Sequence, residues 1–226
     1  MRLHQEWVKS LVKESFLKDY PVEVIPNGID TSVFKPTHGD FRKKYGLENK
    51  FIILGVANVW EERKGLKHFL ELASMLKQDE VIVLVGLNKK QIKKLPRGII
   101  GIERTNSARE LAEIYATADV FVNPTLEDNY PTVNLEAQAC GTYVITFDSG
   151  GAKETLLKVG FTGTYLSNKT SQELRNCIDH LRRDLTLVRL KNQPLFLEKQ
   201  LDATDFAKAY VELYDKVLST NFRTEK

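Results

Sequence analysis

Apolar residues follow two alternating patterns along this chain. Short runs rich in β-branched residues, each of strand length, lie at residues 51–58, 81–86, 98–102, 118–123, 142–147 and 161–165. Between them apolar residues recur every three or four positions, which predicts helices at 66–76, 89–95 and 107–117, and others starting near 131, 152 and 171. Strands that alternate with helices in this way predict an α/β fold with a Rossmann-like, doubly wound parallel sheet.

The two ends of the chain depart from this alternation. Apolar positions such as Trp7 and Leu11 predict that residues 1–20 form one amphipathic helix. Another helix and a tail are expected at residues 204–226, with apolar side chains along one side of the helix. An α/β domain at residues 21–203 would lie between them. The apolar sides of the two terminal helices either pair with each other or stay partly exposed.

Acidic and amide side chains gather on one loop between a strand and a helix. Residues 124–130 form this loop, which carries Glu127, Asp128 and Asn129, and Pro131 suits the first turn of the helix that follows. In an open parallel sheet such loops lie at the carboxyl edge, where ligands bind, and the start of a helix offers free N–H groups to a diphosphate. The loop side chains suit the hydroxyl groups of a sugar.

Glu136 lies on the helix that follows this loop. At that position its carboxylate could hold the diol of a ribose, so the loop and the helix together suit a nucleoside diphosphate with a sugar attached. In the alternative interpretation, Glu127 and Asp128 only cap the helix and Glu136 faces solvent.

A pair of cations stands at a second crossing from strand to helix. Arg63 and Lys64, followed by Gly65, come after the strand predicted at 51–58 and before the helix at 66–76. Two cations there could neutralise a departing diphosphate, a role that a metal ion plays elsewhere. The alternative is an ordinary exposed basic pair on a charged loop.

Two glycines and one acid form a weaker group of candidates. Gly150 and Gly151 either let the backbone approach a phosphate or merely permit a positive φ. Glu154 follows just inside the next helix, where it is expected to complement the helix dipole rather than contact a ligand.

Composition narrows the choice of partners and chemistry. The 226 residues carry a net charge of +3 and a pI near 8.7, and this excess of positive charge is too small to indicate a protein that binds nucleic acid. Cys140 and Cys177 are too few for a disulfide framework, and the histidines show no metal-ligand spacing. The sequence has no secretory signal or transmembrane stretch, which predicts a cytoplasmic protein. Basic residues at 89–97 are usually a solvated face, and in a minority interpretation they contact an anionic membrane.

Several motifs together resemble a known family. The segments at residues 24–36, 63–65, 118–125, 135–141 and 150–151 are similar to the C-terminal, donor-binding half of glycosyltransferase family 4 (group 1) enzymes, which have the GT-B fold. The resemblance covers nearly the whole chain. It implies that an acceptor-binding N-terminal domain is missing here and that the helix at residues 1–20 belongs to it or packs on it.

The resemblance also assigns roles to individual residues. Glu136 matches the second of two glutamates that bracket the donor, while Arg63 and Lys64 match the pair that binds the diphosphate. The first glutamate falls on Asp128 by spacing, with Glu127 one residue further out, and either acid could contact the sugar. The other donor-binding residues that the resemblance implies are Asn129, Tyr130, Thr132, Arg104, Gly150 and Gly151. Arg104 lies on a loop that is equally well explained as a simple capped turn.

The implied activity is a retaining sugar transfer from a nucleoside-diphosphate sugar to an acceptor hydroxyl. The resemblance implies no cofactor, and the sequence has no Asp-x-Asp motif to bind a metal. A role in surface or capsular polysaccharide synthesis follows, with a glycan or lipid-linked glycan as acceptor and weak turnover by this chain alone. Two alternatives remain: a non-catalytic nucleotide-sugar-binding module that needs a partner subunit, and a related GT-B enzyme such as a sugar-nucleotide epimerase or a glycogen-type synthase.

Overall fold

Six parallel strands form the central sheet of the computed structural model, which describes residues 2–3, 6–157, 163–184 and 202–221. The strands are β3 (Phe51–Val56), β4 (Glu80–Val85), β5 (Ile99–Ile102), β6 (Val120–Asn123), β7 (Val144–Phe147) and β8 (Gly163–Leu166). Their order in the sheet is β5-β4-β3-β6-β7-β8, and every neighbouring pair is parallel. The predicted doubly wound parallel sheet is therefore confirmed.

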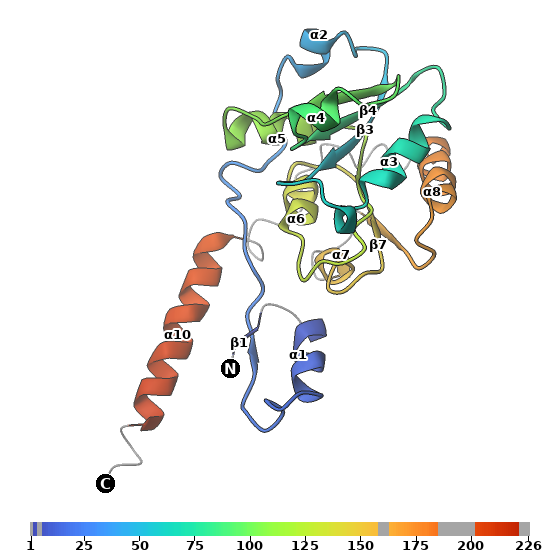
Figure 1. Ribbon diagram of the computed structural model, residues 1–226. Helices are drawn as coiled ribbons and strands as arrows, with labels where there is room; N and C mark the ends of the chain where they lie inside the picture. The colour runs from blue at the N-terminus through green and yellow to red at the C-terminus, as the bar shows by residue number, and fades with distance from the viewer. Residues whose placement is uncertain (1, 4–5, 158–162, 185–201, 222–226) are drawn as a thin grey trace.

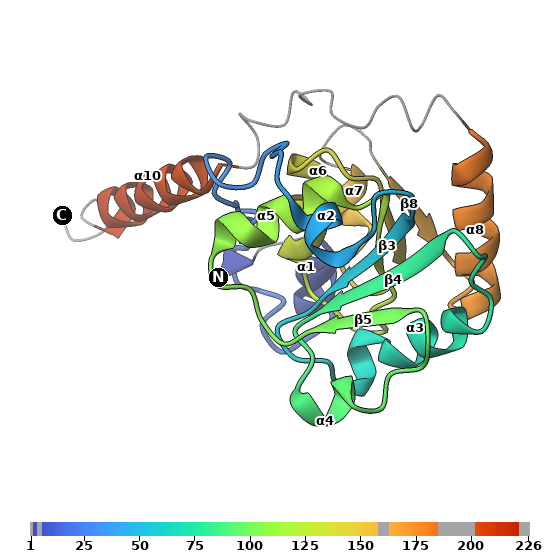
Figure 2. The same ribbon diagram turned by 90° about the horizontal axis from the view of Figure 1, so that it is seen from above.

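Helices cover both faces of this sheet (Figure 1 and Figure 2). One face carries α2 (Phe41–Tyr45), α5 (Ala108–Thr117), α6 (Thr132–Ala139) and α7 (Glu154–Leu157), and the other carries α3 (Leu66–Ala73), α4 (Lys89–Ile92) and α8 (Ser171–Arg183). Side chains alternate along β3, so that Ile52 and Leu54 join the core under the first face while Ile53 joins the core under the second. Burial on both faces explains why the strand sequences are continuously apolar.

The element boundaries shift slightly from those predicted. Ser107 caps α5, because its hydroxyl accepts the N–H of Glu110 at 3.1 Å. The carboxylate of Glu110 accepts the N–H of Asn106 at 2.7 Å, one residue before the cap. Part of the predicted strand at residues 161–165 lies outside the described residues, and β8 begins at Gly163.

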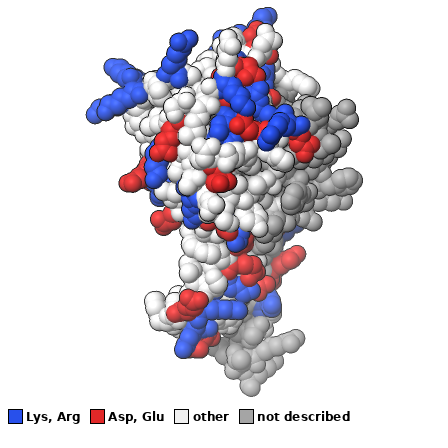
Figure 3. Space-filling view, turned by 90° about the vertical axis from the view of Figure 1, so that its right-hand side faces the viewer, with Lys and Arg blue, Asp and Glu red and all other residues white. Residues whose placement is uncertain are grey.

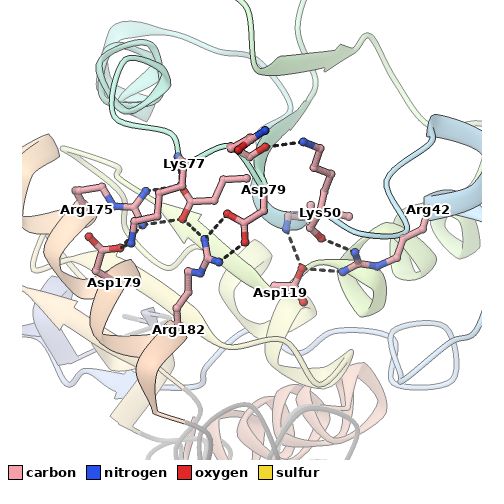
Figure 4. A network of polar contacts seen from close by, with 11 residues as sticks. Arg42, Lys50, Lys77, Asp79, Asp119, Arg175, Asp179 and Arg182 are labelled. Atoms are coloured by element: carbon pink, nitrogen blue, oxygen red, sulfur yellow. Dashed lines mark hydrogen bonds and ion pairs between the residues drawn. The ribbon is translucent and has the colours of Figure 1, made fainter.

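A network of ion pairs ties the amino edge of the sheet together (Figure 4). Glu80 opens β4 with a side chain that is completely buried, and it accepts Arg175 Nη1 at 2.7 Å and Arg182 Nη1 at 2.5 Å. Further along the same edge, Asp119 accepts Arg42 Nη2 at 2.7 Å and the N–H of Ile52 at 2.8 Å. These contacts link α8 and α2 to the starts of the strands, because each carboxylate bonds partners from other elements.

The prediction of one helix over residues 1–20 is wrong in its extent. The structure has a short strand β1 (Arg2–Leu3), the helix α1 (Glu6–Lys13), and a series of turns before the strand β2 (Glu23–Val24). Ser15 explains the early end of the helix, because its hydroxyl donates to the Val12 carbonyl at 2.8 Å and accepts the N–H of Leu17 at 3.1 Å. β1 pairs in parallel with β2 as a separate two-stranded sheet.

Glu154 fixes α1 to the main domain. Its two carboxylate oxygens accept the backbone N–H groups of Trp7 at 2.7 Å and Glu6 at 3.1 Å. A carboxylate at this position satisfies free N–H groups and complements the positive end of the helix. Glu154 lies in the first turn of its own helix α7, where its charge complements the dipole as predicted, and it also caps a helix more than a hundred residues away in sequence.

Substitution of Glu154 by alanine is expected to release α1 without unfolding the domain. Loss of the cap should destabilise the helix by about 1 kcal/mol, which corresponds to roughly fivefold faster amide exchange in residues 6–13. Hydrogen exchange followed by mass spectrometry measures this change. Glu48→Ala, which removes an exposed carboxylate elsewhere, is the matched control, and equal exchange in both variants would show that α1 is held by other contacts.

The last helix, α10 (Ala203–Asn221), leaves the domain at the segment before α2. Ala203 donates its N–H to the Ile29 carbonyl at 2.9 Å, and Thr31 donates to the Asp202 carboxylate at 2.7 Å. Beyond this point α10 lies apart from α1 in both views (Figure 1 and Figure 2), so the two predicted apolar stripes do not pair. Val217 is 49% exposed and Leu218 is 56% exposed. None of the described helices has both the length and the apolar composition to cross a lipid bilayer.

Candidate functional site

A cavity of about 430 Å³ opens at the carboxyl edge of the sheet, between the loops that follow β3 and β6. It is lined by residues 56–61, 63–64, 123, 128 and 130–133. The strand order runs outward in opposite directions from β3 and β6, so the cavity lies at the topological switch point of the sheet. Ligands of open α/β sheets bind at such points.

The basic pair reaches this cavity because of the glycine that follows it. Arg63 and Lys64 end a short 3₁₀ turn, η1 (Glu62–Lys64), and the Arg63 carbonyl accepts the N–H of Leu126 at 2.7 Å. Gly65 has a φ of 73°, and a Cβ atom there would lie 2.1 Å from the Pro124 carbonyl oxygen. Only glycine allows this approach of the two loops. The motif therefore places two cations beside the loop that follows β6.

Both cations already have acidic partners at the cavity. Lys64 Nζ lies 2.5 Å from Asp128 Oδ2, and these side chains are 21% and 13% exposed. Arg63 Nε lies 2.9 Å from Glu61 Oε2 in a more exposed pair. An anionic ligand that enters the cavity would therefore exchange carboxylate partners for phosphate oxygens. The structure thus brings Asp128 and the basic pair together, because β3 and β6, which precede them, are neighbours in the sheet.

Gly150 and Gly151 hold the backbone of Asp128. Gly151 donates its N–H to the Asp128 carbonyl at 3.1 Å, and a Cβ atom on Gly150 would lie 2.3 Å from the same oxygen. Gly150 has a positive φ of 55°. The close backbone approach is thus made to the loop that carries Asp128, and the N–H of Gly151 is already used there.

Thr132 and Glu136 lie one turn apart on the same side of α6. Thr132 lines the cavity, while Glu136 lies further along the helix and is half-buried. Burial raises the pKa of Glu136, and hydrogen bonds from the side chains of Tyr115 and Thr132 oppose that rise. Glu136 is therefore not a freely solvated residue of the helix surface.

Tyr130 lines the cavity while its ring points into the core. The residue is 6% exposed and packs with Ile29 and Leu135. Burial, with a smaller effect from the charge of Glu154, raises the pKa of Tyr130 to about 12. Its phenol is consequently neutral at physiological pH.

Six of the predicted residues do not line the cavity: Glu136, Gly150 and Gly151, described above, and Glu127, Asn129 and Arg104. Glu127 and Asn129 are exposed on the same loop, on either side of Asp128. Arg104 is exposed after β5, the edge strand of the sheet, and the neighbouring Asn106 donates two hydrogen bonds to the Glu110 carboxylate. The turn at Arg104 is therefore a capped turn in this structure.

The pattern of the sequence did not single out three residues that shape the site. Trp60 lines the cavity and is fixed by a hydrogen bond from its Nε1 to the Val85 carbonyl at 2.9 Å. Asn123 lines it at the end of β6 and donates to the Asn134 side chain at 2.9 Å. Tyr115 donates its hydroxyl to Glu136 at 3.0 Å. A polar residue at the end of a buried strand could have indicated Asn123, whereas the sequence around Trp60 and Tyr115 carries no signal for a role in the site.

An open parallel sheet with a cavity at its switch point, lined by a basic pair with its carboxylate partners and by the start of a helix, defines a doubly wound α/β domain that is built to bind ligands at this edge. Within that class, residues 50–184 match the family model described as Glycosyl transferases group 1. The chain belongs to this family. The predicted group 1 resemblance is thereby confirmed.

Individual relatives agree with this assignment. The chain is 28% identical over 216 residues to the N,N'-diacetylbacillosaminyl-diphospho-undecaprenol alpha-1,3-N-acetylgalactosaminyltransferase of Campylobacter jejuni. The alignment covers 89% of this chain and 56% of the relative. Sucrose-phosphate synthase from Thermosynechococcus elongatus superposes with a TM-score of 0.83 at 20% identity, covering 97% of this chain and 58% of that one. Anabaena HepE in complex with UDP-glucose superposes with a TM-score of 0.78 at 18% sequence identity, and the match covers 95% of this chain and 63% of HepE.

These comparisons also show how the length of the chain compares with that of its relatives. It spans about half the length of the curated relatives that it matches. The solved structures share its fold, so the domain has the architecture found in GT-B glycosyltransferases, as predicted.

Proposed function

We propose that this chain is the donor-binding half of a retaining glycosyltransferase, which transfers a sugar from a nucleoside-diphosphate sugar to an acceptor hydroxyl. The observation that carries the proposal is the position of Arg63 and Lys64 at the cavity beside the start of α6, in a member of the group 1 family. HepE, which shares the fold, was solved with UDP-glucose.

The proposed chemistry breaks the bond between the sugar C1 and the diphosphate oxygen and forms a bond from C1 to the acceptor oxygen on the same face, and the proton of the acceptor hydroxyl passes to the departing diphosphate oxygen. Arg63 and Lys64 stabilise the negative charge that develops on the departing diphosphate, together with the N-terminal end of α6. In this proposal they act where other enzymes use a metal ion, so the reaction needs no metal or cofactor.

The remaining site residues are proposed to bind the donor. Glu136 accepts hydrogen bonds from the ribose hydroxyls, and Asp128 or Glu127 contacts the sugar. The backbone around Asn129 and Thr132 lies on the path between sugar and phosphates. Orientation of the acceptor requires a second domain, so the chain alone is proposed to bind donor but to turn over weakly.

The acceptor is proposed to be a glycan or a lipid-linked glycan, in surface or capsular polysaccharide synthesis. The Campylobacter relative is named for a diphospho-undecaprenol substrate, which supports this proposal. The basic residues at 89–97 are all exposed. α4 lies at the front of Figure 1 and hence at the left of Figure 3, where Lys and Arg side chains project at the upper left. Such a patch suits contact with an anionic membrane from the cytoplasmic side.

Calorimetric titration of this chain with UDP, GDP and ADP, and with their glucose or mannose conjugates, tests the proposal. Saturable binding of one diphosphate is expected without added divalent metal, and it identifies the base. A sample with native circular dichroism that binds none of them would overturn the proposed donor site.

Replacement of Glu136 by alanine is expected to weaken binding of the ribonucleoside diphosphate about tenfold or more. A hydrogen bond to a charged group contributes roughly 1.5–3 kcal/mol, and alanine removes the acceptor. Affinity for the 2′,3′-dideoxy analogue should stay unchanged, because that ligand lacks the hydroxyls. Titration calorimetry of both ligands, with Glu48→Ala as the control, measures the difference; unchanged ribonucleotide affinity would remove Glu136 from the site.

A second candidate is a non-catalytic module that binds nucleotide sugar and works with a separate acceptor-binding subunit. The exposed apolar side chains of α10, among them Val211 at 59% and Leu218 at 56%, favour a protein partner. A measurement of donor hydrolysis by the chain, detected as release of nucleoside diphosphate, distinguishes the two candidate functions. Slow release supports the enzyme half, and binding without any release supports the module.

A further inference from the structure

Tyr115 makes a buried contact with the site from outside the cavity. It lies on α5, is fully buried, and donates its hydroxyl to Oε2 of Glu136 on α6 at 3.0 Å. Its hydroxyl is thus fixed on one of the two oxygens of the carboxylate. Thr132, one turn earlier on α6, also bonds to this carboxylate, so it is held both from its own helix and from α5.

The ring of Tyr115 is held firmly in place. It packs edge-on against Phe121 at a centroid distance of 5.4 Å and against Phe34 at 6.2 Å. Its backbone carbonyl accepts the hydroxyl of Thr142 at 2.5 Å. These contacts restrict movement of the ring, and through its hydroxyl they restrict the Glu136 carboxylate as well.

The protonation states agree with this arrangement. Burial, and next the charge of Glu136, raise the pKa of Tyr115 well above its ordinary value, so the phenol remains a neutral donor. Burial also raises the pKa of Cys140, one turn further along α6, to about 12, so the thiol beside Glu136 is neutral too. Burial acts to protonate Glu136, while the bonds from Tyr115 and Thr132 favour its ionised form.

We propose that Tyr115 is a positioning residue, which fixes the Glu136 carboxylate in the orientation that accepts the two neighbouring hydroxyls of a ribose. This inference rests on the proposed donor site. A carboxylate that is already oriented binds two vicinal hydroxyls more tightly, because a freely rotating carboxylate would lose side-chain entropy on binding.

Tyr115→Phe tests the inference, because phenylalanine keeps the ring contacts and removes only the hydroxyl. The probe is whichever of UDP, GDP and ADP binds the unmodified chain, together with its 2′,3′-dideoxy form. We expect the ratio of ribose to dideoxy affinities to fall about tenfold, while the dideoxy affinity is unchanged. Tyr143→Phe, which removes a tyrosine hydroxyl bonded to Thr164 at 2.6 Å between β7 and β8, should leave the ratio as it was.

The pH dependence gives a readout that a purely structural role would not move. The ribose preference requires ionised Glu136, so it should disappear as the pH falls through the raised pKa of that residue. Without the Tyr115 hydroxyl this pKa rises further, and the preference should be lost at a higher pH. Comparison with the dideoxy ligand cancels the titration of the diphosphate itself.

Incorporation of 3-fluorotyrosine at position 115 keeps both ring and hydroxyl, and it serves if Tyr115→Phe does not fold. Its more acidic phenol is a stronger donor, so the ribose preference should persist to lower pH than in the unmodified chain. An unchanged ratio and an unchanged pH profile in these variants would overturn the inference, as would equal losses for both ligands. A chain that binds none of the diphosphates would instead overturn the proposed function.

Discussion

Substitution of Arg63 and Lys64 together by alanine is expected to weaken binding of the nucleoside diphosphate by about a hundredfold, while binding of the bare nucleoside changes little. Hydrogen bonds between charged groups contribute roughly 1.5–3 kcal/mol each, and two such bonds at the lower limit give about 3 kcal/mol. The lower limit applies because the Arg63 side chain is 49% exposed and therefore screened by solvent. Titration calorimetry with both ligands measures the effect.

A matched control removes the same charge elsewhere. Lys67 and Lys94 are exposed and do not line the cavity, so Lys67→Ala with Lys94→Ala should leave diphosphate affinity nearly intact. The affinity lost in the Arg63 and Lys64 variant should also depend on salt, because the interaction is between charges. Equal losses for diphosphate and nucleoside would contradict the assignment of the basic pair to the phosphates.

Glu80→Gln is expected to destabilise the fold by about 3 kcal/mol, the largest effect on stability that we predict. The network holds three cations and three carboxylates: Lys77, Arg175, Arg182, Asp79, Glu80 and Asp179. Glutamine keeps the volume of Glu80 but leaves the buried Arg175, only 7% exposed, with less than its full charge compensation. The midpoint of urea unfolding, followed by circular dichroism, measures the loss.

The dependence of stability on pH checks the same network. Burial acts to raise the pKa of Glu80, but hydrogen bonds from Arg175, from the Lys77 backbone and from Arg182 bring it below its ordinary value. The bond from Arg182 likewise lowers the pKa of Asp79. A lowered folded-state pKa gives stability that is present above about pH 4 and is lost as the pH falls through that folded value. Glu80→Gln should therefore flatten the acid part of the stability curve.

An exposed ion pair is the control for this substitution. Lys208→Ala breaks the pair with Asp205 on α10, whose side chains are 68% and 51% exposed, and should change stability by less than about 1 kcal/mol. If Glu80→Gln were no more destabilising than Lys208→Ala, the network would contribute no more than a surface pair does.

The pattern of apolar runs predicted the strands of the sheet, and it placed several candidate site residues on the loops that follow them. Continuous apolar runs such as 51–58 and 118–123 suit strands that are buried on both faces, and neighbouring parallel strands end at one edge. Arg63, Lys64 and Asp128 follow these two strands, and only the family resemblance brought them to one site, because the pattern of the sequence does not report that the two strands are neighbours.

Other features depend on contacts between distant segments, which no local pattern contains. Tyr115 and Glu136 meet because α5 packs on α6, and Glu154 caps α1 because α1 lies against the Gly150 turn. The early end of α1 depends on a competition between the Ser15 hydroxyl and the helix backbone, and helical periodicity does not report such a competition.

The amino edge of the sheet carries the buried ion network, whereas the opposite edge carries the cavity. Loops 57–64 and 124–132 can therefore be exchanged for those of relatives with other donors, while the bonds around Glu80 remain in place. A graft has to keep Gly65, which follows the first loop, because the Pro124 carbonyl leaves no space for a side chain there. The domain is in this sense a scaffold whose cavity loops can be varied, in which a failed graft shows as lost ligand binding rather than lost folding.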